Sequence, residues 1–374
     1  MRKKQTIVIL VPILAHYRRD VYRYLSNSKD FDFIFFGGKN YENIKTIDDL
    51  KSQTFNYFSF QLAKHTFYFF KLAIREIIKA KPKAIVSSGV DFHLIHSFLL
   101  FFIFRIILRK KFYWWSQGTT GHQGKVGWIF RKMVYKLSSG VMLYSQAGFE
   151  NLMKMKVPSR KLAVLNNCLN AEDYGFLNYD IVNRREKWDS LKILFIGRIT
   201  SKVDLNVLLK SLSFINSSVK RKILSNIVGG GDIAHYVKLA KDYKLEDQVN
   251  FTGPLYGKDA HNYFLESDLF VYPGGIGLSI AHALSFGLPV ITTDNMKLHN
   301  PEIELLKPGF NGDLYHDNDY QDLSKIILKW DQELTQNRNK HAKSCIDTVE
   351  KLNYLPEKVS ENIISFLKTE LLSK

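Results

Sequence analysis

The feature that most constrains the fold is an alternation of short, β-rich apolar runs with amphipathic stretches of helical length. In the first part of the chain, the runs predicted as strands are 6–11, 31–36, 55–60, 84–88, 112–116, 140–144 and 162–165. Helices are predicted between most of them, for example at 17–26, 67–80, 93–108, 126–137 and 146–154. Strands that alternate with helices in this way are typical of a parallel sheet covered by helices.

A second series of the same kind follows a polar, non-periodic stretch at 171–190, which is predicted as a linker. Its strands are expected near 192–196, 224–228, 249–252, 268–272, 289–292 and 312–315, and its helices near 204–214, 233–243, 258–266 and 277–286. The tail, 319–372, reads as helices only. We therefore expect two doubly wound α/β domains that face each other, with ligand in the cleft outside the carboxyl ends of the strands.

The length of the chain agrees with two domains, since 374 residues exceed the usual allowance of about 150 residues per domain. We expect an N-terminal domain over 1–170 and a C-terminal domain over 191–350. A final helix within 351–374 is expected to pack back on the N-terminal domain.

Cysteine usage and the N-terminal run both favour a cytoplasmic protein. Only two cysteines, Cys168 and Cys345, are present, which excludes a disulfide framework and a cysteine-rich zinc site. The apolar N-terminal run is short and ends at His16, Tyr17 and Arg18. It is therefore interpreted as a buried first strand rather than a signal peptide.

The positive charge of the chain is concentrated in its first 140 residues. They hold 24 lysines and arginines against 8 acidic residues, whereas the remainder is almost balanced. Such asymmetry indicates a polyanionic partner or surface for the first domain. The same half contains an apolar, aromatic segment at 92–115 that includes a basic cluster, and a second segment of similar character at 66–83. The apolar core of the first is about 15 residues, short of the ~20 that a membrane span requires.

These two segments have alternative interpretations. Each can be a buried helix of an α/β domain, or a helix that lies on an anionic membrane surface through its basic residues. Two such segments in one basic half favour the membrane, and hence a peripheral position on the inner face of the cell membrane. A nucleic-acid groove also combines basic and aromatic residues, but no recognisable nucleic-acid module accompanies them, so nucleic acid is not expected as a partner.

Glycine-rich turns follow four predicted strands of the second domain. The first turn contains Gly197, Arg198 and Lys202, and its two cations supply the charge that a diphosphate requires. Unpaired amides at such turns and at helix N-termini attract phosphate or sugar oxygens. Each turn alone is equally typical of a tight connection between a strand and a helix. The other three turns contain Gly229, Gly230 and Gly231; Gly253 and Pro254; and Gly274, Gly275, Gly277 and Leu278, the last leading into a small-residue helix with His282.

In this order and spacing, the turns resemble the C-terminal domain of GT-B glycosyltransferases, most closely the large retaining group known as family 4. The stretches that carry the resemblance are GRITSK, VGGGD, VNFTG and YPGGIGLSIAHALSFGLPVITT, with NPEIELLKPGFNGDL behind the last. In the first half, PILAHYRRDVYRYL, YWWSQG and VLNNCLNAEDY resemble segments of one subgroup. The resemblance covers most of residues 6–315 and implies the GT-B fold: two Rossmann-like domains that face a cleft, with C-terminal helices.

Several positions depart from the family pattern. The two glutamates of its E-x7-E motif fall on Gly274 and His282. A neutral imidazole can still hold a ribose by one hydrogen bond, whereas a glycine offers only backbone amides. The N-terminal histidine of the family falls on Gln117, with His122 five residues later. Lys202 lies one position earlier than the usual lysine relative to the following pair of leucines.

The resemblance implies transfer of a sugar from a nucleotide-diphosphate sugar to a lipid-linked or membrane-anchored glycan, with retention at the anomeric carbon. No metal or other cofactor is expected, because cationic side chains can stabilise the leaving diphosphate. The candidate catalytic residues are Arg198, Lys202 and His122. The four glycine turns, with Leu278 and His282, are expected to bind the donor. On the acceptor side, the expected residues are His16, Tyr17, Arg18 and Gln117. A composition rich in Lys, Asn and Ile suggests a bacterium, where surface polysaccharide assembly is the natural setting.

Two other functions are alternatives to glycosyl transfer, and two stretches of the sequence match a metal motif. A sugar-nucleotide epimerase would need catalytic carboxylates that the sequence does not place. A membrane-associated scaffold with a catalytically inactive donor site is favoured by the glycine at 274 and the glutamine at 117. The stretches 30–32 and 317–319 match a D-x-D metal motif, but one opens a strand and the other lies in a surface turn. No metal site is therefore predicted.

Overall fold

The computed structural model describes residues 4–39, 46–47, 52–56, 58–62, 65–69, 71–89, 95–118, 125–181, 189–200, 202–216 and 222–372. They form two compact units, each built on its own parallel sheet. Unit 1 comprises Met1–Asn170 and Leu355–Lys374, and unit 2 comprises Ala171–Tyr354.

Unit 1 contains a seven-stranded sheet in the order β3-β2-β1-β6-β7-β8-β9, in which every neighbouring pair is parallel. The inner strand β1 is apolar at successive positions because both faces of the sheet are covered. Ile7 and Ile9 point into one core, and Val8 and Leu10 point into the other. The strands are β1 (Gln5–Ile13), β2 (Phe31–Lys39), β3 (Ser52–Asn56), β6 (Ala84–Ser88), β7 (Lys111–Ser116), β8 (Gly140–Leu143) and β9 (Leu162–Val164).

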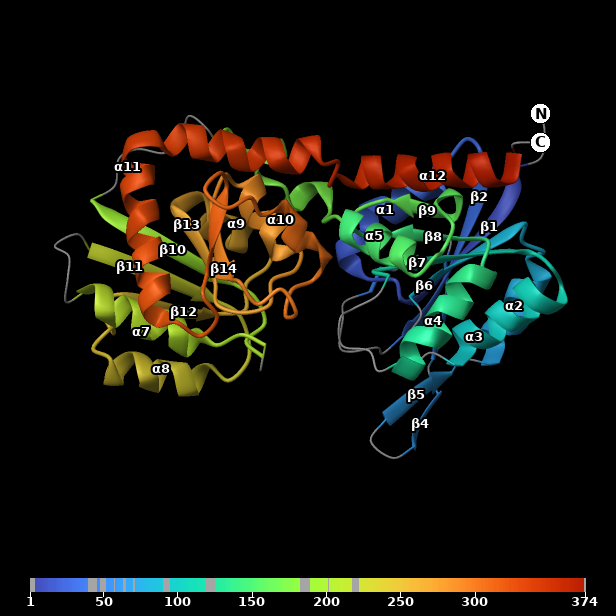
Figure 1. Cartoon of the computed structure of the whole chain (residues 1–374), viewed down its shortest axis with the longest axis horizontal. Helices are drawn as coiled ribbons and strands as arrows, with labels where there is room; N and C mark the ends of the chain where they lie inside the picture. Colours follow the sequence, from blue (N-terminus) through green and yellow to red (C-terminus); the bar gives the residue numbers. More distant parts are fainter. Residues whose placement is uncertain are drawn as a thin grey trace. The chain divides into compact units, whose positions relative to one another are not determined.

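Helices from distant parts of the sequence cover the two faces of this sheet (Figure 1). The core that contains Ile7 also contains side chains of α1 (Arg19–Ser26) and α12 (Pro356–Leu372), which contact each other. Ser360 Oγ of α12 donates to the Val21 carbonyl oxygen of α1 at 3.3 Å. The opposite core is formed with α2 (Lys71–Lys79), α3 (Ile95–Leu100), η2 (Phe101–Ile107), α4 (Lys125–Leu137) and α5 (Gln146–Lys154).

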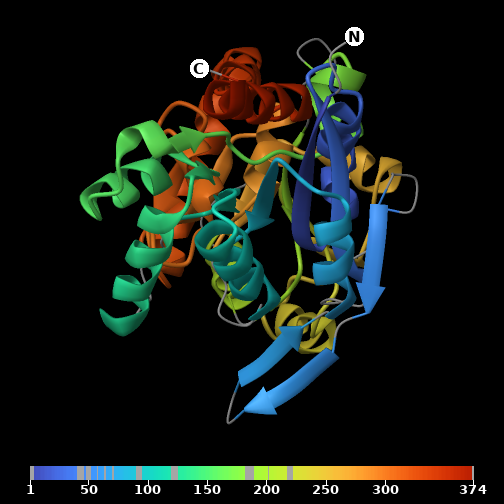
Figure 2. The same cartoon turned by 90° about the vertical axis from the view of Figure 1, so that its right-hand side faces the viewer.

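Two predicted elements of unit 1 differ from the structure. The strand expected at 55–60 falls across the end of β3 and the start of β4 (Phe58–Leu62). The helix expected at 67–80 is wrong over its first residues, because β5 (His65–Phe69) pairs antiparallel with β4 in a hairpin (Figure 2). The aromatic run at this place suits a strand as well as a helix. The long helix expected at 93–108 is formed by α3 and the π-helical turn η2.

Unit 2 contains a six-stranded parallel sheet in the order β12-β11-β10-β13-β14-β15. The second series of predicted strands and helices is confirmed, with ends that differ by a few residues. The strands are β10 (Ser190–Ile196), β11 (Lys222–Val228), β12 (Val249–Gly253), β13 (Leu269–Tyr272), β14 (Val290–Thr293) and β15 (Gly312–Tyr315). The helices between them are α7 (Leu205–Asn216), α8 (Ile233–Asp242), α9 (Lys258–Glu266) and α10 (Ser279–Ser285).

The tail is helical, as predicted. It forms α11 (Tyr320–Lys351), which is kinked at Asn337, and then α12. The first half of α11 packs on α7, and the whole helix stays within unit 2. No helix among the described residues is both long enough and apolar enough to cross a membrane.

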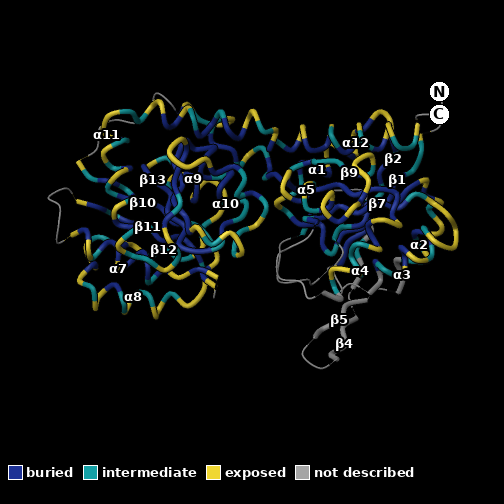
Figure 3. The backbone as a smooth tube through the Cα atoms, viewed as in Figure 1, coloured by how far each residue is buried: buried dark blue, intermediate teal, exposed yellow. Residues whose placement is uncertain are grey.

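The beginning of the expected linker is folded into unit 2. Residues 171–181 form η4 (Ala171–Asp173) and α6 (Gly175–Asn178). The buried Tyr174 hydroxyl donates to the Tyr354 carbonyl oxygen, and Gly175 lies against the ring of Phe286 with no room for a side chain. Burial of one aromatic side chain fixes a stretch whose overall polarity had indicated a linker. In both units the inner strands are largely buried, and the exposed residues that the structure describes gather on the helices and loops (Figure 3).

Candidate active site

The glycine turns of unit 2 meet at the carboxyl edge of its sheet, where the loops after β10, β11 and β12 are joined backbone to backbone. Ile199 N–H donates to Gly230 O at 2.9 Å, and Gly229 N–H donates to Gly253 O at 2.9 Å. A Cβ atom on Gly229 would overlap the carbonyl oxygen of Gly197. The close approach of these loops therefore requires glycine, whatever the site binds.

The turn after β13 closes in the same way on the segment around Lys202. Gly275 N–H donates to Lys202 O at 3.2 Å, and Val203 forms an antiparallel bridge with Gly274. A Cβ atom on Gly274 would overlap the Lys202 carbonyl oxygen, and the φ angle of +152° disfavours a side chain. Two of the departures from the family pattern, Gly274 and the early Lys202, are therefore in contact with each other.

The amides of the β13 turn are largely satisfied within the protein. Gly274 N–H donates to Tyr272 O at 2.9 Å, and Ile276 N–H donates to His299 Nδ1 at 3.1 Å. His299 Nε2 in turn lies 2.8 Å from Thr293 O, which fixes the proton on Nε2. The backbone amide of Gly274, the group left to face a donor sugar at that position, is thus used inside the loop.

Other backbone N–H groups of the glycine turns are available to donate to a ligand. Within the described part of the chain, the N–H groups of Gly230, Gly231, Gly277 and Leu278 have no hydrogen-bond acceptor. The last two directly precede α10, which begins at Ser279 rather than at the expected residue 277. Unpaired amides at the end of parallel strands are suited to phosphate or sugar oxygens.

Two cations lie on the turn after β10. Arg198 and Lys202 are exposed, and neither forms an ion pair with another described residue. Burial raises the pKa of Tyr272, at the end of β13, and the positive charge of Arg198 acts in the opposite direction. Arg198 therefore lies near the mouth of the β13 turn. Exposed cations without carboxylate partners, beside unpaired amides, favour an anionic ligand such as a diphosphate.

His282 lies in an aromatic cluster between α9 and α10. Its ring centre is 4.2 Å from that of Phe264, 5.5 Å from that of Phe286 and 5.8 Å from that of His261. Burial, assisted by His261, lowers the pKa of His282 to about 3, so the ring is neutral near pH 7. Its buried Nε2 has no hydrogen-bond partner among the described residues. The ring thus packs among aromatic side chains.

Arg18 lies at the carboxyl edge of the unit 1 sheet, enclosed by aromatic rings. Its guanidinium carbon is 4.9 Å from the ring centre of Trp115 and 5.0 Å from that of Tyr144. Arg18 Nη2 donates to Asn167 Oδ1 at 3.3 Å, and the buried Nε has no acceptor among the described residues. A guanidinium held by rings keeps hydrogen-bonding capacity for a polar or anionic group of an acceptor.

Sequence patterns alone do not single out Trp115, Tyr144 or Asn167. Trp115 is the second-last residue of β7. Tyr144 directly follows β8, and Asn167 follows β9 closely. The signal that could have found them is this shared position, because the carboxyl ends of neighbouring parallel strands lie at one edge of a sheet.

The remaining acceptor-side residues follow β1 and β7. The carbonyl oxygen of His16 accepts from Asn170 Nδ2 at 2.9 Å, and the next residue, Tyr17, is exposed. Gln117 is half-buried and precedes Gly118, whose carbonyl oxygen accepts from the Tyr135 hydroxyl at 2.9 Å. His122, expected to be catalytic, lies outside the described residues.

The described residues contain no cluster of three or more His, Cys, Asp or Glu placed to hold a metal ion. In the second D-x-D stretch, Asp319 caps α11 by accepting from the amides of Gln321 and Asp322. Asp317 accepts from Thr293 Oγ1 at 2.7 Å. In the first stretch, Asp30 pairs with Lys368 at 3.0 Å. These carboxylates therefore have structural roles.

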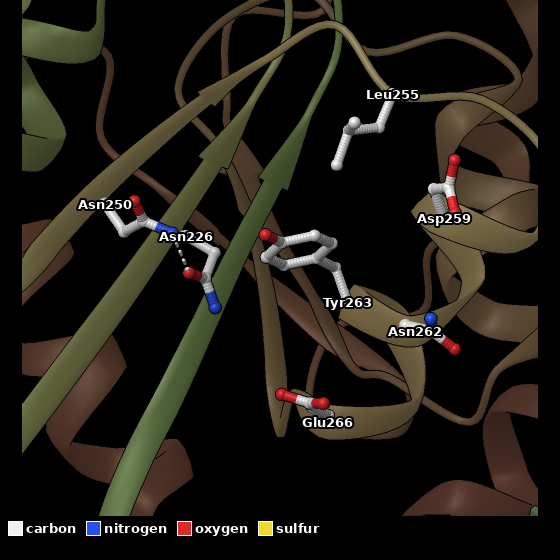
Figure 4. A pocket seen from close by; sticks show the side chains of 7 residues that line it. All are labelled: Asn226, Asn250, Leu255, Asp259, Asn262, Tyr263 and Glu266. Carbon is white, nitrogen blue, oxygen red and sulfur yellow. Dashed lines mark hydrogen bonds between the residues drawn. The ribbon is translucent and has the colours of Figure 1, made fainter.

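A hollow of about 540 Å³ lies beside α9, against β11 and β12 (Figure 4). Asn250 Nδ2 donates to Asn226 Oδ1 at 3.2 Å across its floor, and Leu255 lies at its upper end. Asp259 and Glu266 also line it, with no cationic side chain among the lining residues. An acidic lining repels phosphate, so the diphosphate of a donor is expected at the glycine turns instead.

Residues 181–347 match the family described as Glycosyl transferases group 1. This match to a family of glycosyltransferases covers a little less than half of the chain. The match lies wholly within unit 2, the unit that holds the glycine turns, Arg198 and Lys202. The family resemblance noted in the sequence is thereby confirmed.

Comparison with known proteins also establishes the GT-B fold. The chain is similar to the crystal structure of HepE from Anabaena in complex with UDP, with a TM-score of 0.71, 15% identity and coverage of 98% of this chain and 100% of that one. It is similar to the lipopolysaccharide outer core galactosyltransferase WaaB in its apo form, with a TM-score of 0.70, 13% identity, and coverage of 98% and 100%. A curated relative, an uncharacterized glycosyltransferase of Methanocaldococcus jannaschii, is 23% identical over 56% of this chain. The chain spans about half the length of this relative, 52%.

Proposed function

We propose that the protein transfers a sugar from a nucleotide-diphosphate sugar to a glycan or lipid-linked acceptor. The observation that carries the proposal is the pair of exposed cations, Arg198 and Lys202, which form no ion pair with another described residue and lie beside the available amides of the glycine turns. The match to group 1 glycosyl transferases and a similar structure that binds UDP support it.

In the proposed reaction, the bond between the anomeric carbon and the β-phosphate oxygen breaks, and an acceptor oxygen bonds to that carbon as it loses its proton. Negative charge grows on the diphosphate as the bond breaks, so cations held in place are the main catalytic requirement. Arg198 and Lys202 would supply them, with the amides of Gly230 and Gly231 as further donors. We propose retention at the anomeric carbon, as in the family, and assign no protein nucleophile.

The donor sugar is proposed to be recognised without the first glutamate of the family motif. The Lys202 carbonyl oxygen lies where a side chain at residue 274 would begin, so no carboxylate can reach the sugar from that position. Amides of Gly277 and Leu278 are available in its place.

We place the acceptor beside Arg18, in the strongly basic unit 1. A glycan that bears phosphate or carboxylate groups would complete the hydrogen bonds of its guanidinium. The similarity to a lipopolysaccharide outer core galactosyltransferase supports surface polysaccharide as the product class. We propose that it is made at the inner face of the bacterial cell membrane.

The proposal is tested by the thermal stability of the protein in the presence of UDP, GDP, dTDP or CDP. One nucleotide at about 100 times its dissociation constant should stabilise the fold by about 2.7 kcal/mol. Arg198→Ala should abolish this shift, whereas Lys238→Ala, at an exposed lysine on α8, should keep it. A wild-type protein that responds to none of the four would favour a GT-B scaffold without donor binding. A nucleotide response without transfer to any glycan acceptor would favour an epimerase.

A further inference from the structure

The helical pair α3–η2 and α4 lies side by side on one face of the unit 1 sheet (Figures 1 and 2). The ring of Phe98 in α3 is 5.4 Å from that of Phe130 in α4. Seven residues further along each segment, Arg105 Nε donates to the Leu137 carbonyl oxygen at 2.7 Å. Two equally spaced contacts show that the helices run in the same direction, so their outer sides form one surface.

The inner side of this pair is fully used in the core. Phe101 and Phe104 are buried, and the Phe101 ring packs 5.4 Å from Phe112 and 5.6 Å from Trp114 of β7. A buried helix, the first interpretation of this segment, therefore accounts for Phe101 and Phe104. It does not account for the residues on the outer side.

The outer side of the pair exposes large apolar side chains. On α4, Ile129, Met133 and Leu137 follow each other at intervals of four residues and form one stripe, with Ile129 62% exposed. On η2, Phe102 and Ile107 are 53% and 59% exposed. Scattered exposed apolar residues are ordinary, but a contiguous patch marks an interaction surface. The residues of this patch, termed the α3–α4 surface, are Leu99, Phe102, Ile106, Ile107, Leu108, Trp128, Ile129, Met133 and Leu137.

The segment of the chain that forms the α3–α4 surface carries charge of one sign. The sequence from Phe92 to Phe149 contains eight lysines and arginines and no aspartate or glutamate. Lys132 and Lys136 run along α4 beside the apolar stripe, and Lys132 Nζ lies 4.8 Å from the ring centre of Trp128. Arg109 and Lys110 are exposed directly after η2.

We propose that the α3–α4 surface docks on an anionic lipid bilayer, with α4 lying in the plane of the interface. A helix of 13 residues is about 20 Å long, too short to cross a hydrocarbon core of about 30 Å. An apolar stripe flanked by lysines is suited to the headgroup region, where aliphatic side chains enter the acyl boundary and cations meet anionic headgroups.

The charge and composition favour this occupant over two others. A second copy of the chain would bring two surfaces of the same positive sign together, which repel. Nucleic acid binds basic grooves through stacked aromatic rings, whereas six of the nine residues of the α3–α4 surface are isoleucine or leucine, which do not stack. Only a membrane offers an apolar and an anionic layer at once.

The inference deepens the proposed function by naming where the enzyme meets the membrane that holds its acceptor, but its test needs no catalysis. The full chain is sedimented with vesicles of phosphatidylcholine alone and with vesicles that contain 30% phosphatidylglycerol. We expect strong binding to the second kind only. The double variant Ile107→Glu/Ile129→Glu should weaken that binding by about tenfold or more. Phe214→Glu, at a 43% exposed phenylalanine on α7 of unit 2, is the matched control and should bind as the wild type.

A second pair of variants separates charge from apolar contact. Lys132→Glu/Lys136→Glu should reduce binding to the anionic vesicles by a similar factor and increase its sensitivity to salt. Nucleotide-induced stabilisation is measured on every variant and should be unchanged, which shows that unit 2 is intact. Equal binding by wild type and both double variants would overturn the proposal, as would equal binding to neutral vesicles. A concentration-dependent dimer, or DNA binding, that both double variants abolish while vesicle binding persists would overturn it as well.

Discussion

At the scale of single residues, two of the departures from the glycosyltransferase pattern, Gly274 and the early Lys202, form one feature. The Lys202 carbonyl oxygen occupies the place of a Cβ atom on Gly274 and accepts from the next amide, Gly275 N–H. A lysine at the earlier position 202 and a glutamate at 274 are not compatible, because the backbones at the two positions touch. A sequence comparison sees two separate losses, whereas the structure shows one rearranged turn.

The closed turn predicts that the family glutamate cannot be restored by one substitution. Gly274→Glu should lower the free energy of unfolding by about 3 kcal/mol, because the new Cβ atom forces the two loops apart and the backbone angle is unfavourable. Urea unfolding measures the loss. Gly230→Ala is the control, since its Cβ atom would meet only Pro254 Cγ at 3.8 Å, and it should cost less than about 1 kcal/mol. Equal stability of the glutamate variant and the wild type would show that the turn is open.

The buried ring of His282 predicts a pH-dependent stability. The unfolded chain binds a proton at this side chain near pH 6.5, whereas the folded chain binds it only near pH 3. Stability is therefore fully present above about pH 6.5 and is lost as the pH falls toward 3. Between pH 7 and 5.5 the loss from His282 is about 1 kcal/mol.

Unfolding in urea at those two pH values tests the effect. His282→Phe keeps a ring in the aromatic cluster and removes the titration, so the pH dependence should become shallower. A residual slope is expected from His261, whose pKa is also lowered by burial. A variant with the same slope as the wild type would place the titration elsewhere.

At the scale of elements, the errors of prediction concern aromatic runs. The stretch from Thr66 to Phe70 is apolar without a clear period, and aromatic residues favour strands, so periodicity could not separate β5 from the start of α2. The turn η2 escaped prediction for a related reason. A π-helical turn changes which of its residues face inward by one position, and Phe101 to Ile107 offer apolar side chains for either choice.

Two ion pairs of the long helix α11, one buried and one exposed, test whether burial decides how much an ion pair stabilises the fold. After its kink at Asn337, Arg338 pairs with Asp268, whose side chain is 1% exposed and also accepts from Lys192 N–H at 2.9 Å. Arg338→Met leaves this carboxylate buried without its cation and should cost about 3 kcal/mol in urea unfolding. On the same helix, Lys329 pairs with Asp313 but is 54% exposed. Lys329→Met should therefore cost less than about 1 kcal/mol, and equal effects would show that burial is not the deciding factor.

At the scale of the whole molecule, the sequence predicted the architecture well because a parallel α/β fold has a strong signature. Each buried strand and each helix leaves its own pattern, and the order of patterns gives two sheets. The positions of the glycine turns followed directly, because a turn lies where a strand ends. The surroundings of Arg18 did not follow, since Trp115, Tyr144 and Asn167 come from three distant segments that only the strand order brings together.

The last helix is the clearest case in which sequence order and structural unit differ. α12 follows unit 2 in the chain but belongs to unit 1, where Val359, Ile363 and Leu367 are buried in the core that contains α1. Ile363→Ala should lower the stability of unit 1 by about 3 kcal/mol, while Leu372→Ala, at a 44% exposed position of the same helix, should change it by less than about 0.5 kcal/mol. Calorimetry with and without a bound nucleotide separates the units, because a donor nucleotide raises only the transition of the unit that binds it. Ile363→Ala should shift the transition that the nucleotide leaves unchanged. A shift of the nucleotide-sensitive transition instead would place α12 with unit 2.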